Sequence, residues 1–445
     1  MVVSLFDMKQ RQLHQFPLLH SAGFKKKLLS FYKDENHLVY LESNQGSLKY
    51  DSYATLIGVG AIDRITCKSG TAVEQLAAFR TAHPDWMFGF LGYDLKNELE
   101  NLESTHQDLL DFPDLCFFVP ELVFEISDKE VKLHSFITSQ NDAEKLIQKI
   151  QEHSFSDPKT VAQEVVLKAK DSKEAYLQKA QKVLDHIHRG DIYEANFCTQ
   201  FYAQDVVLDT QKAFYDLNSI SEPPFAVYAR LGSYYAISAS PERYLKKTGN
   251  QLISQPIKGT AKRSTDLTED ESLKEALFND PKERSENVMI VDLVRNDLSK
   301  TAVKGSVAVE ELFGIYTFKQ VHQMISTVMA ELDQKYTAID AIKTTFPMGS
   351  MTGAPKISAM EIIEKNESFK RGLYSGAIGY FTPQNDFDFN VVIRTILFNE
   401  DRNTLSFSVG SALTAAAIPE KEYEECFLKA RALIEVLALQ GIRFD

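Results

Sequence analysis

Residues 376–410, GAIGYFTPQNDFDFNVVIRTILFNEDRNTLSFSVG, decide the fold class of this chain. Three runs rich in β-branched and aromatic residues, 376–382, 388–398 and 405–410, follow one another with only short polar stretches between them. Such runs predict strands, and no helical segment separates them. Helices and strands therefore do not alternate one for one, which favours an α+β fold over a parallel doubly wound sheet.

Predicted helices flank these strands. Asp171 and Glu174 resemble a capping box, and a helical run follows them until Gly190. A long C-terminal helix begins at Pro419 and runs to Gly441, which fits the preference for Pro at the first helical position and for Gly just past the end. The other elements predicted here are helices over 283–298, over 338–346 and from Lys356, and strands over 193–203, 224–232 and 234–241.

The first 165 residues give weaker signals. Residues 138–172 form the most polar stretch of the chain, and this composition predicts a linker or a change of subdomain. Strand-like runs occur before it at 37–43, 115–127 and 131–137.

Composition and charge exclude several classes of protein. Apolar residues make up 44% and charged residues 25% of the 445 residues, which are ordinary values for a globular chain. The formal net charge of −13 makes a general binder of nucleic acid or of anionic membranes a poor interpretation. The four cysteines lie far apart without a CxxC pair, so neither a zinc site nor a dithiol site is indicated.

Targeting and nucleotide-binding signals are missing from the sequence. Residues 1–16 lack the apolar core of a signal peptide, and no apolar run reaches the roughly 18 residues of a membrane span. We therefore expect a cytoplasmic protein with reduced cysteines. Walker A, GxGxxG and GxSxG sequences are absent, which removes the main support for a nucleotide-binding protein or an α/β-hydrolase.

Two residues near the middle of the chain are candidates for acid and nucleophilic chemistry. Glu242 leaves the end of a predicted strand in SPERYL. Lys258 lies in PIKGT between Pro256 and Gly259, and a lysine that such a turn holds away from water has a lowered pKa and a free amine lone pair. The alternative is a solvated lysine beside a turn.

Two pairs of acidic residues repeat one spacing. Glu283 and Glu286, and likewise Glu422 and Glu425, stand three residues apart in the first turn of a predicted helix. Acidic residues there also complement the helix dipole, which is the plain structural explanation. If the two pairs converge, their oxygens suit Mg²⁺, with water and substrate completing the octahedron.

A third group of residues suits an anionic ligand. Glycines with Ser350, Thr352 and Lys356 provide donors at a predicted helix start, which is a natural anion cradle. Arg394 lies inside a strongly apolar predicted strand and must face a partner, because a lone buried charge is too costly. That partner is either another side chain or a carboxylate of the ligand.

The order of these motifs resembles the chorismate-utilising enzymes, which include anthranilate, aminodeoxychorismate, isochorismate and salicylate synthases. The match is dense over roughly 171–440, and in the N-terminal part FGFLGYDLK (88–96) is its best piece. We therefore divide the chain into a weakly matched N-terminal region, 1–165, and a chorismate-binding catalytic region, 166–445. The motifs that carry the resemblance are SPER, PIKGT, SENVMIVDLVRNDL, GSMTGAPK, SGAIGYF, VVIRT and EKEYEE.

The resemblance implies a fold, a cofactor and a set of site residues. The implied fold is α+β, with large antiparallel β-sheets packed as a sandwich and helices outside. Glu286 and Glu425 match carboxylates that bind Mg²⁺, with Glu283 and Glu422 beside them. Tyr374 and Arg394 match groups that hold the enolpyruvyl carboxylate of chorismate. The remaining implied substrate-binding residues are Gly410, His322, Ser350, Thr260 and Lys356.

Lys258 decides which member of the family the chain resembles. Anthranilate synthases carry Ala at this position, whereas PIKGT resembles aminodeoxychorismate synthase component I. There the lysine is thought to attack C2 of chorismate, and ammonia then adds at C4. Glu242 matches the acid that protonates the leaving hydroxyl. Isochorismate synthases use a lysine base at the position that is Glu194 here, which counts against water as the nucleophile.

Three positions depart from the family pattern. Ala412 stands where a third glycine is usual, and Ala416 replaces a common Asp. If the first position needs a positive φ, Ala costs of order 1 kcal/mol there. Glu194 replaces a usual Gln, and pairing with Lys258 would hold the amine protonated at rest.

The resemblance implies a nitrogen-supplying partner, because the chain carries no glutaminase signature. We expect chorismate amination at C4 with Mg²⁺ and with ammonia from a separate class I glutamine amidotransferase subunit, and no partnership with nucleic acid or membrane. The alternatives are anthranilate synthase component I, an isochorismate or salicylate synthase, and a non-catalytic chorismate-binding subunit.

Overall fold

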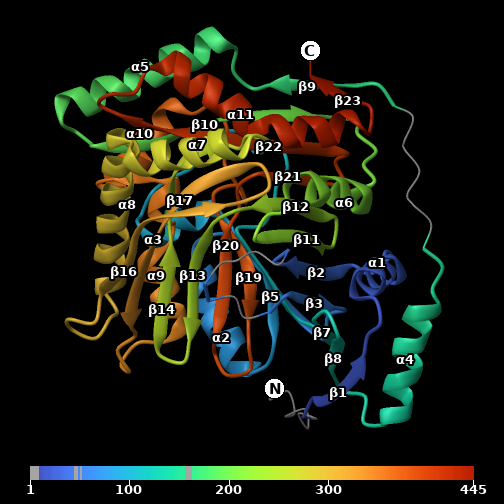
Figure 1. Cartoon of the computed structure of the whole chain (residues 1–445). Helices are drawn as coiled ribbons and strands as arrows, with labels where there is room; N and C mark the ends of the chain where they lie inside the picture. Colours follow the sequence, from blue (N-terminus) through green and yellow to red (C-terminus); the bar gives the residue numbers. More distant parts are fainter. Residues whose placement is uncertain (1–9, 45–48, 51–52, 156–162, 445) are drawn as a thin grey trace.

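Two large β-sheets form the centre of the computed structural model (Figure 1). The structure describes residues 10–44, 49–50, 53–155 and 163–444. The described residues do not include 1–9, which belong to the N-terminal segment without a signal-peptide core, or 156–162, which belong to the polar stretch.

The larger sheet has thirteen strands among the described residues, and β18 (Gly353–Ala354) pairs with β10 beside the main order. The order across this sheet is β1 (Gln12–Pro17), β8 (Glu130–Ser135), β7 (Leu122–Ile126), β3 (Thr55–Val59), β2 (His37–Glu42), β11 (Phe225–Leu231), β12 (Tyr234–Ser240), β21 (Thr395–Asn399), β22 (Thr404–Thr414), β10 (Glu194–Ala203), β9 (Val165–Ala169) and β23 (Ile442–Phe444).

The smaller sheet has ten described strands, and β16 (Ala308–Thr317) pairs with β17 beside the main order. Among the described residues, all neighbouring strands in both sheets pair antiparallel except β9 with β23. The order is β15 (Ile257–Lys262), β17 (Val321–Glu331), β14 (Gln251–Gln255), β13 (Arg243–Thr248), β20 (Phe387–Val391), β19 (Ala377–Phe381), β5 (Met87–Leu91), β6 (Leu115–Val119) and β4 (Asp63–Cys67).

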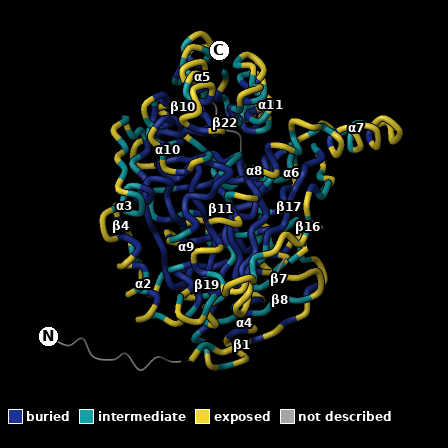
Figure 2. Tube along the Cα trace, turned by 90° about the vertical axis from the view of Figure 1, so that its left-hand side faces the viewer, coloured by how far each residue is buried: buried dark blue, intermediate teal, exposed yellow. Residues whose placement is uncertain are grey.

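Helices cover the outer faces of both sheets. One apolar cluster joins the larger sheet to α1 (Ser21–Phe31), α4 (Gln140–Glu152), α5 (Lys173–Arg189), α6 (Thr210–Ser221), α10 (Lys356–Asn366) and α11 (Pro419–Ala438). A second cluster fills the space between the sheets and continues over the other face of the smaller sheet, where it includes residues of α2 (Ala72–Ala82), α8 (Pro281–Ser299) and α9 (Ala338–Thr345). Two further helices are α3 (Lys96–Leu99) and α7 (Leu267–Asn279), and α7 extends from the body of the molecule in Figure 2. No described helix is both long and apolar enough to cross a membrane.

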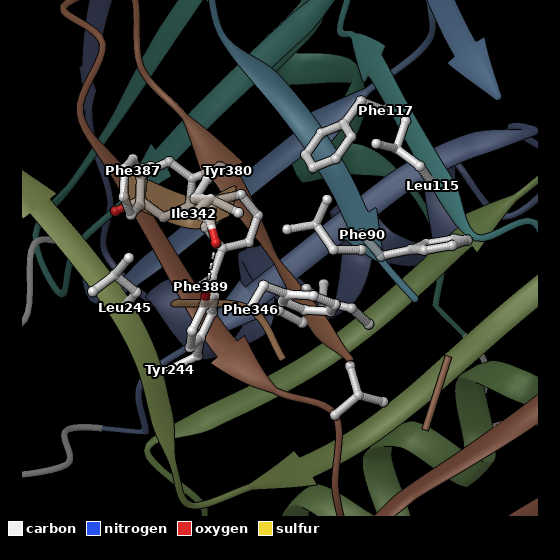
Figure 3. Close-up of a cluster of buried hydrophobic side chains, with 14 of the residues drawn as sticks. Phe90, Leu115, Phe117, Tyr244, Leu245, Ile342, Phe346, Tyr380, Phe387 and Phe389 are labelled. Atoms are coloured by element: carbon white, nitrogen blue, oxygen red, sulfur yellow. Dashed lines mark hydrogen bonds between the residues drawn. The ribbon is translucent and has the colours of Figure 1, made fainter. Parts of the chain in front are cut away.

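Strand periodicity explains why the strands read as almost continuous apolar runs. In β11 Ala226 and Tyr228 belong to the cluster under the helices, whereas Val227 and Ala229 belong to the cluster between the sheets. Successive side chains of a strand point to opposite faces, and both faces of this sheet are covered. Figure 3 shows how densely buried aromatic residues of the smaller sheet pack, among them Tyr244, whose hydroxyl donates to Ile342 O of α9 at 3.3 Å. The predicted α+β sandwich with helices outside is confirmed.

The chain crosses from one sheet to the other at two points that matter for function. Pro241 and Glu242 link β12 in the larger sheet to β13 in the smaller one, and Val392–Arg394 link β20 back to β21. The two crossings are hydrogen-bonded together, since Val391 N donates to Glu242 O at 3.0 Å and Ala239 N donates to Arg394 O at 3.0 Å.

The single strand predicted over 388–398 is therefore wrong. It is two strands in two different sheets, and Arg394 between them has φ 50°, a value outside the range of strands. The sequence does not mark the break because Val391 and Val392 at the crossing are themselves fully buried. The run 115–127 is divided in the same way at Pro120 and Glu121.

The polar stretch 138–172 is more ordered than predicted. It contains α4, whose N-cap Ser139 accepts a hydrogen bond from Asp142 N and whose Ala143, Ile147 and Ile150 are buried at helical spacing. The next helix, α5, is capped by Ser172 and not by Asp171, and Gly190 ends it as predicted with φ 86°.

Strands from both sides of residue 165 pair directly. The pairing of β2 with β11 joins Tyr40 to Tyr228 in the larger sheet. The smaller sheet likewise pairs β5 with β19. Both sheets continue across residue 165 and mark no boundary there. The division into 1–165 and 166–445 therefore stays a prediction that rests on the sequence match.

Candidate active site

A cavity of about 460 Å³ opens where the two sheet crossings meet α8 and α11. Its walls contain eleven of the thirteen residues that the sequence singled out. These are Glu242, Lys258, Thr260, Glu283, Glu286, Ser350, Tyr374, Arg394, Gly410, Glu422 and Glu425. Residues from distant parts of the chain thus converge on one space, and these include the two acidic pairs, whose spacing alone did not show that they would meet.

Lys258 reaches the cavity from a bulge at the edge of the smaller sheet. The register between β15 and β17 shifts between Ile257 and Thr260, which re-aims the strand. Gly259 within the bulge has φ 95°, a conformation that side chains disfavour. A Cβ there would also come within 3.2 Å of Glu283 Oε2. The glycine is therefore required for the turn that presents Lys258.

Lys258 is a buried ammonium held by carboxylates. Its Nζ donates a hydrogen bond to Glu194 Oε1, which confirms the pairing expected from the sequence. Burial alone would lower the pKa of Lys258, but the negative charges of Glu194 and Glu286 outweigh it and raise the pKa. The expectation that burial frees the amine lone pair is therefore wrong for the resting state.

Glu242 is suited to donate a proton. Its side chain lies at the crossing between β12 and β13 and is buried. Burial raises the pKa of Glu242 to about 7, although the neighbouring Ser350 hydroxyl and Lys258 ammonium oppose the rise. Near neutral pH a large fraction of this carboxyl group is therefore protonated.

The four acidic residues of α8 and α11 face the cavity together with two lysines. Lys282 Nζ lies 3.3 Å from Glu422 Oε1 and 3.8 Å from Glu286 Oε1, so it bridges the two helices. Lys429 Nζ lies 2.7 Å from Glu425 Oε1. Sequence reasoning missed both lysines, although the position of Lys429 four residues after Glu425 on a helix was an available signal.

Burial and charge set the state of these carboxylates. Burial raises the pKa of Glu286 to about 7 and also raises the pKa values of Glu283 and Glu422. For Glu425 burial acts in the same sense, but the ammonium of Lys429 outweighs it and the pKa is lowered.

Among the described residues, no group of three His, Cys, Asp or Glu side chains stands ready to hold a metal ion. The donor chemistry of the four carboxylates nevertheless fits a hard divalent cation, which would replace the lysine as their counter-charge.

Arg394 provides a cationic group at the crossing on the other side. No side chain among the described residues forms a hydrogen bond or an ion pair with its guanidinium. Burial lowers the pKa of Arg394 to about 10, although the charge of Glu242 acts in the opposite sense. Of the two predicted partners, a carboxylate of a ligand is therefore the one that the geometry favours.

A buried network fixes the wall beside Arg394. The Tyr374 hydroxyl donates to Cys198 Sγ at 3.5 Å, and a Cβ on Gly410 would collide with the same sulfur atom. The carbonyl oxygen of Gly410 accepts from Lys429 Nζ at 2.8 Å. Ala412 also lines the cavity and has no positive φ, so the strain considered for it does not arise.

His322 and Lys356 do not reach the cavity, contrary to prediction. In β17 the neighbours Val321 and Gln323 line it, so the two-residue period turns His322 to the opposite face. Its Nε2 lies 3.0 Å from Asp270 Oδ1. These placements make His322 a link between β17 and α7.

The predicted anion cradle before α10 is not formed either. Lys356 Nζ donates to Asp297 Oδ2 and, at 3.0 Å, to Thr345 O. The hydroxyl of Thr352 donates to backbone carbonyls of its own turn. Of the three donors only Ser350 lines the cavity, since the other two satisfy buried protein atoms.

Comparison with known proteins agrees with this geometry. The chorismate binding enzyme family matches residues 35–435, which is most of the chain. The chain belongs to the chorismate binding enzyme family. The match also begins well before residue 165, in agreement with the continuous sheets.

Relatives in this family carry two different names. The chain is 33% identical over 380 residues to anthranilate synthase component 1 of Thermus thermophilus, covering 82% of this chain and 81% of that protein. It is also 33% identical over 350 residues to aminodeoxychorismate synthase component 1 of Escherichia coli, covering 78% and 76%. The crystal structure of anthranilate synthase component I from Streptococcus pneumoniae has a TM-score of 0.74 and 25% identity, and the match covers 87% of this chain and 94% of that one.

Proposed function

We propose that this member of the chorismate binding enzyme family aminates chorismate at C4 and yields 4-amino-4-deoxychorismate, in 4-aminobenzoate and folate biosynthesis. The observation that carries the proposal is the presence of Lys258 and Glu242 on the wall of one cavity. A buried amine and a carboxyl group that is partly protonated at neutral pH are the nucleophile and the acid that this substitution needs.

Chorismate is a dicarboxylate, and the lining of two walls of the cavity supports a separate site for each of its carboxylates. Arg394 has no side-chain partner among the described residues, and it lies with Tyr374 on the wall that suits the enolpyruvyl carboxylate. The acidic residues of α8 and α11 lie on the wall that suits the ring carboxylate once a cation is present. Ser350 and Thr260 complete the lining around the ring.

We include Mg²⁺ in the proposal. Glu286 and Glu425 would hold it, with Glu283 and Glu422 beside them, and Lys282 would give up its contact with the carboxylates. Bound Mg²⁺ would supply positive charge for the ring carboxylate. An acidic protein can bind a dianion in this way.

The chain's own groups perform the proposed substitution in two halves. Lys258 Nζ attacks C2 while Glu242 protonates the 4-hydroxyl, because hydroxide is a poor leaving group. Ammonia then adds at C4 and expels the lysine. A covalent lysine adduct thus divides one difficult substitution into two easier ones.

The ammonia would come from a separate class I glutamine amidotransferase subunit, in the cytoplasm. The designation "component 1" of the relatives and the four free buried thiols support these two points. The chain alone should use ammonium salts with activity that rises with pH, and it should be inert with glutamine. Turnover of glutamine by the purified chain would contradict this part of the proposal.

Anthranilate synthase is the second candidate, and the equal identity to the Thermus thermophilus protein favours it. Incubation with chorismate, Mg²⁺ and ammonium chloride, followed by mass spectrometry, separates the two. Aminodeoxychorismate keeps the enolpyruvyl group, whereas anthranilate formation releases pyruvate, which lactate dehydrogenase detects. Isochorismate or salicylate as the product would reject both, and no turnover would favour a non-catalytic chorismate-binding subunit.

A further inference from the structure

The proposed function gives no role to the carboxylate that lies behind Lys258. Glu194 at the start of β10 is 2% exposed and does not line the cavity. Its hydrogen bond from Lys258 Nζ is the one contact of this kind that its carboxylate makes with a described side chain. Glu194 therefore touches the proposed nucleophile and is screened from the substrate by it.

The position of Glu194 restricts where the proton of Lys258 can go. If Nζ released its proton to solvent, Glu194 would remain as a buried carboxylate without a counter-charge, which is costly. Transfer of the same proton from Nζ to Oε1 leaves two neutral groups. A buried site disfavours charged forms, so the second route leads to the free amine at lower cost.

We propose that Lys258 and Glu194 share one proton, and that Glu194 is a catalytic residue that takes this proton when the amine attacks and returns it when the amine leaves. The catalytic part of this inference rests on the proposed function, in which Lys258 is the nucleophile. The proton-sharing part concerns the resting protein and can be tested without chorismate.

The protons of the proposed substitution stay among Lys258, Glu194, Glu242 and the substrates. In the first half the N–C2 bond forms and the C4–O bond breaks, Glu194 holds the lysine proton, and Glu242 gives its proton to the hydroxyl that leaves as water. In the second half ammonia forms the C4–N bond and the C2–N bond breaks. The new C4 ammonium returns a proton to Glu242, and Glu194 returns its proton to Lys258.

A shared proton predicts an unusual dependence on pH. While the pair of Lys258 and Glu194 holds one proton, the fraction with a free amine and a protonated carboxyl group does not depend on pH. A lone lysine instead loses about tenfold in free amine for each pH unit below its pKa. The other carboxylates that act on Lys258 are those of Glu242, Glu283, Glu286 and Glu425, and their titration is common to wild type and to variants at Glu194.

Trinitrobenzenesulfonate tests the pair directly, because this anionic aromatic reagent reacts with neutral amines only. The rate of labelling at Lys258 would be measured by peptide mass spectrometry from about pH 6 to about pH 9, with K258M as the blank. Apart from the drift that titration of the neighbouring carboxylates causes, we expect the wild-type rate to stay flat over this range. In Glu194→Gln it should fall about tenfold per pH unit on the acidic side. Glu194→Asp, which keeps a carboxylate, should retain the flat profile.

Glu242→Gln is the matched control, since it removes another carboxylate of the same size that acts on Lys258, and its profile should stay flat. The contrary result is a wild-type labelling rate that falls in acid, together with a fall at lower pH in Glu194→Gln. It would show that the proton is released to solvent, and it would overturn the proposal. Equal profiles in wild type, Glu194→Gln and Glu194→Asp would overturn it as well.

A second arm separates this inference from the proposed function. Wild type would be mixed with chorismate and Mg²⁺ without ammonium, and its intact mass would be measured. We expect a gain equal to chorismate less one water. No gain together with the expected labelling profiles would reject Lys258 as the nucleophile, and with it the catalytic role of Glu194, while the shared proton stands. A gain together with the contrary labelling profiles would reject the shared proton alone.

Discussion

Replacing Glu242 by Gln should make the fold more stable at alkaline pH while it removes the proposed acid. The carboxyl group is buried at the crossing between β12 and β13, and burial raises its pKa from 4.5 to about 7. A folded-state pKa above the unfolded value means that the native protein binds this proton more tightly. Stability is therefore lost as pH rises from the unfolded to the folded pKa. Gln has nearly the same shape and no proton to lose, so it escapes this loss.

The expected gain follows from the two pKa values. Their difference corresponds to about 3 kcal/mol of free energy of unfolding. The wild type loses this stability by pH 8, whereas the variant keeps it. Unfolding entropy of roughly 2.1 cal/mol/K per residue over 445 residues converts this free energy into about 3 °C in Tm. Near pH 4.5 the two proteins should unfold at almost the same temperature.

Differential scanning calorimetry of wild type and Glu242→Gln at several values of pH measures this difference. Glu286, whose pKa is also raised to about 7, titrates in both proteins, so the comparison isolates Glu242. A variant that is less stable than wild type at pH 8, or a Tm difference that does not grow between pH 4.5 and pH 8, would refute the reasoning. Turnover should fall by about 10²–10⁴ if Glu242 is the general acid.

Three other perturbations test separate parts of the structure. Lys258→Ala should abolish amination at C4 and divert some ammonia to C2, and unchanged production of aminodeoxychorismate would exclude Lys258 as the nucleophile. Chorismate and Mg²⁺ should strengthen each other's binding in calorimetry, an effect that Glu425→Gln should weaken; equal chorismate affinity with and without Mg²⁺ would contradict this. Arg371→Met should lower the free energy of unfolding by about 3–5 kcal/mol, because the buried Glu367 loses the guanidinium that lies 2.6 Å from it. Arg402→Met, which removes a surface ion pair, should lower it by less than about 1 kcal/mol. Similar denaturation midpoints for these two variants would be the contrary result.

Helices of the catalytic region could be predicted closely because local chemistry sets their ends. The helix expected over 283–298 is observed as α8, with Asp280 as its N-cap and Pro281 in its first turn. The two acidic pairs could therefore be placed near the starts of α8 and α11, although only Glu283 and Glu422 lie in first turns. Glu286 and Glu425 lie one turn further along, contrary to the prediction. Their convergence could not be derived, since it depends on how two helices far apart in sequence pack.

The errors at the site come from strand direction and not from residue type. His322 has the right chemistry for a ligand, but its neighbours Val321 and Gln323 occupy the cavity face. Arg394 was placed inside a strand because apolar residues continue through the crossing between the sheets. The pairing of Glu194 with Lys258 was predictable because a buried lysine needs a counter-charge, whereas the order of the strands that join them was not.

The pairing of β5 with β19 has a consequence for synthesis on the ribosome. Gly89 pairs with Gly379, 290 residues later in the chain. At about 5–20 residues per second the edge of β5 waits for roughly 15–60 s before its partner exists. During that time an apolar strand with unsatisfied backbone groups faces the cell interior, where similar edges promote aggregation. Newly made chains of this protein should therefore depend on chaperones until the last quarter of the sequence has been translated.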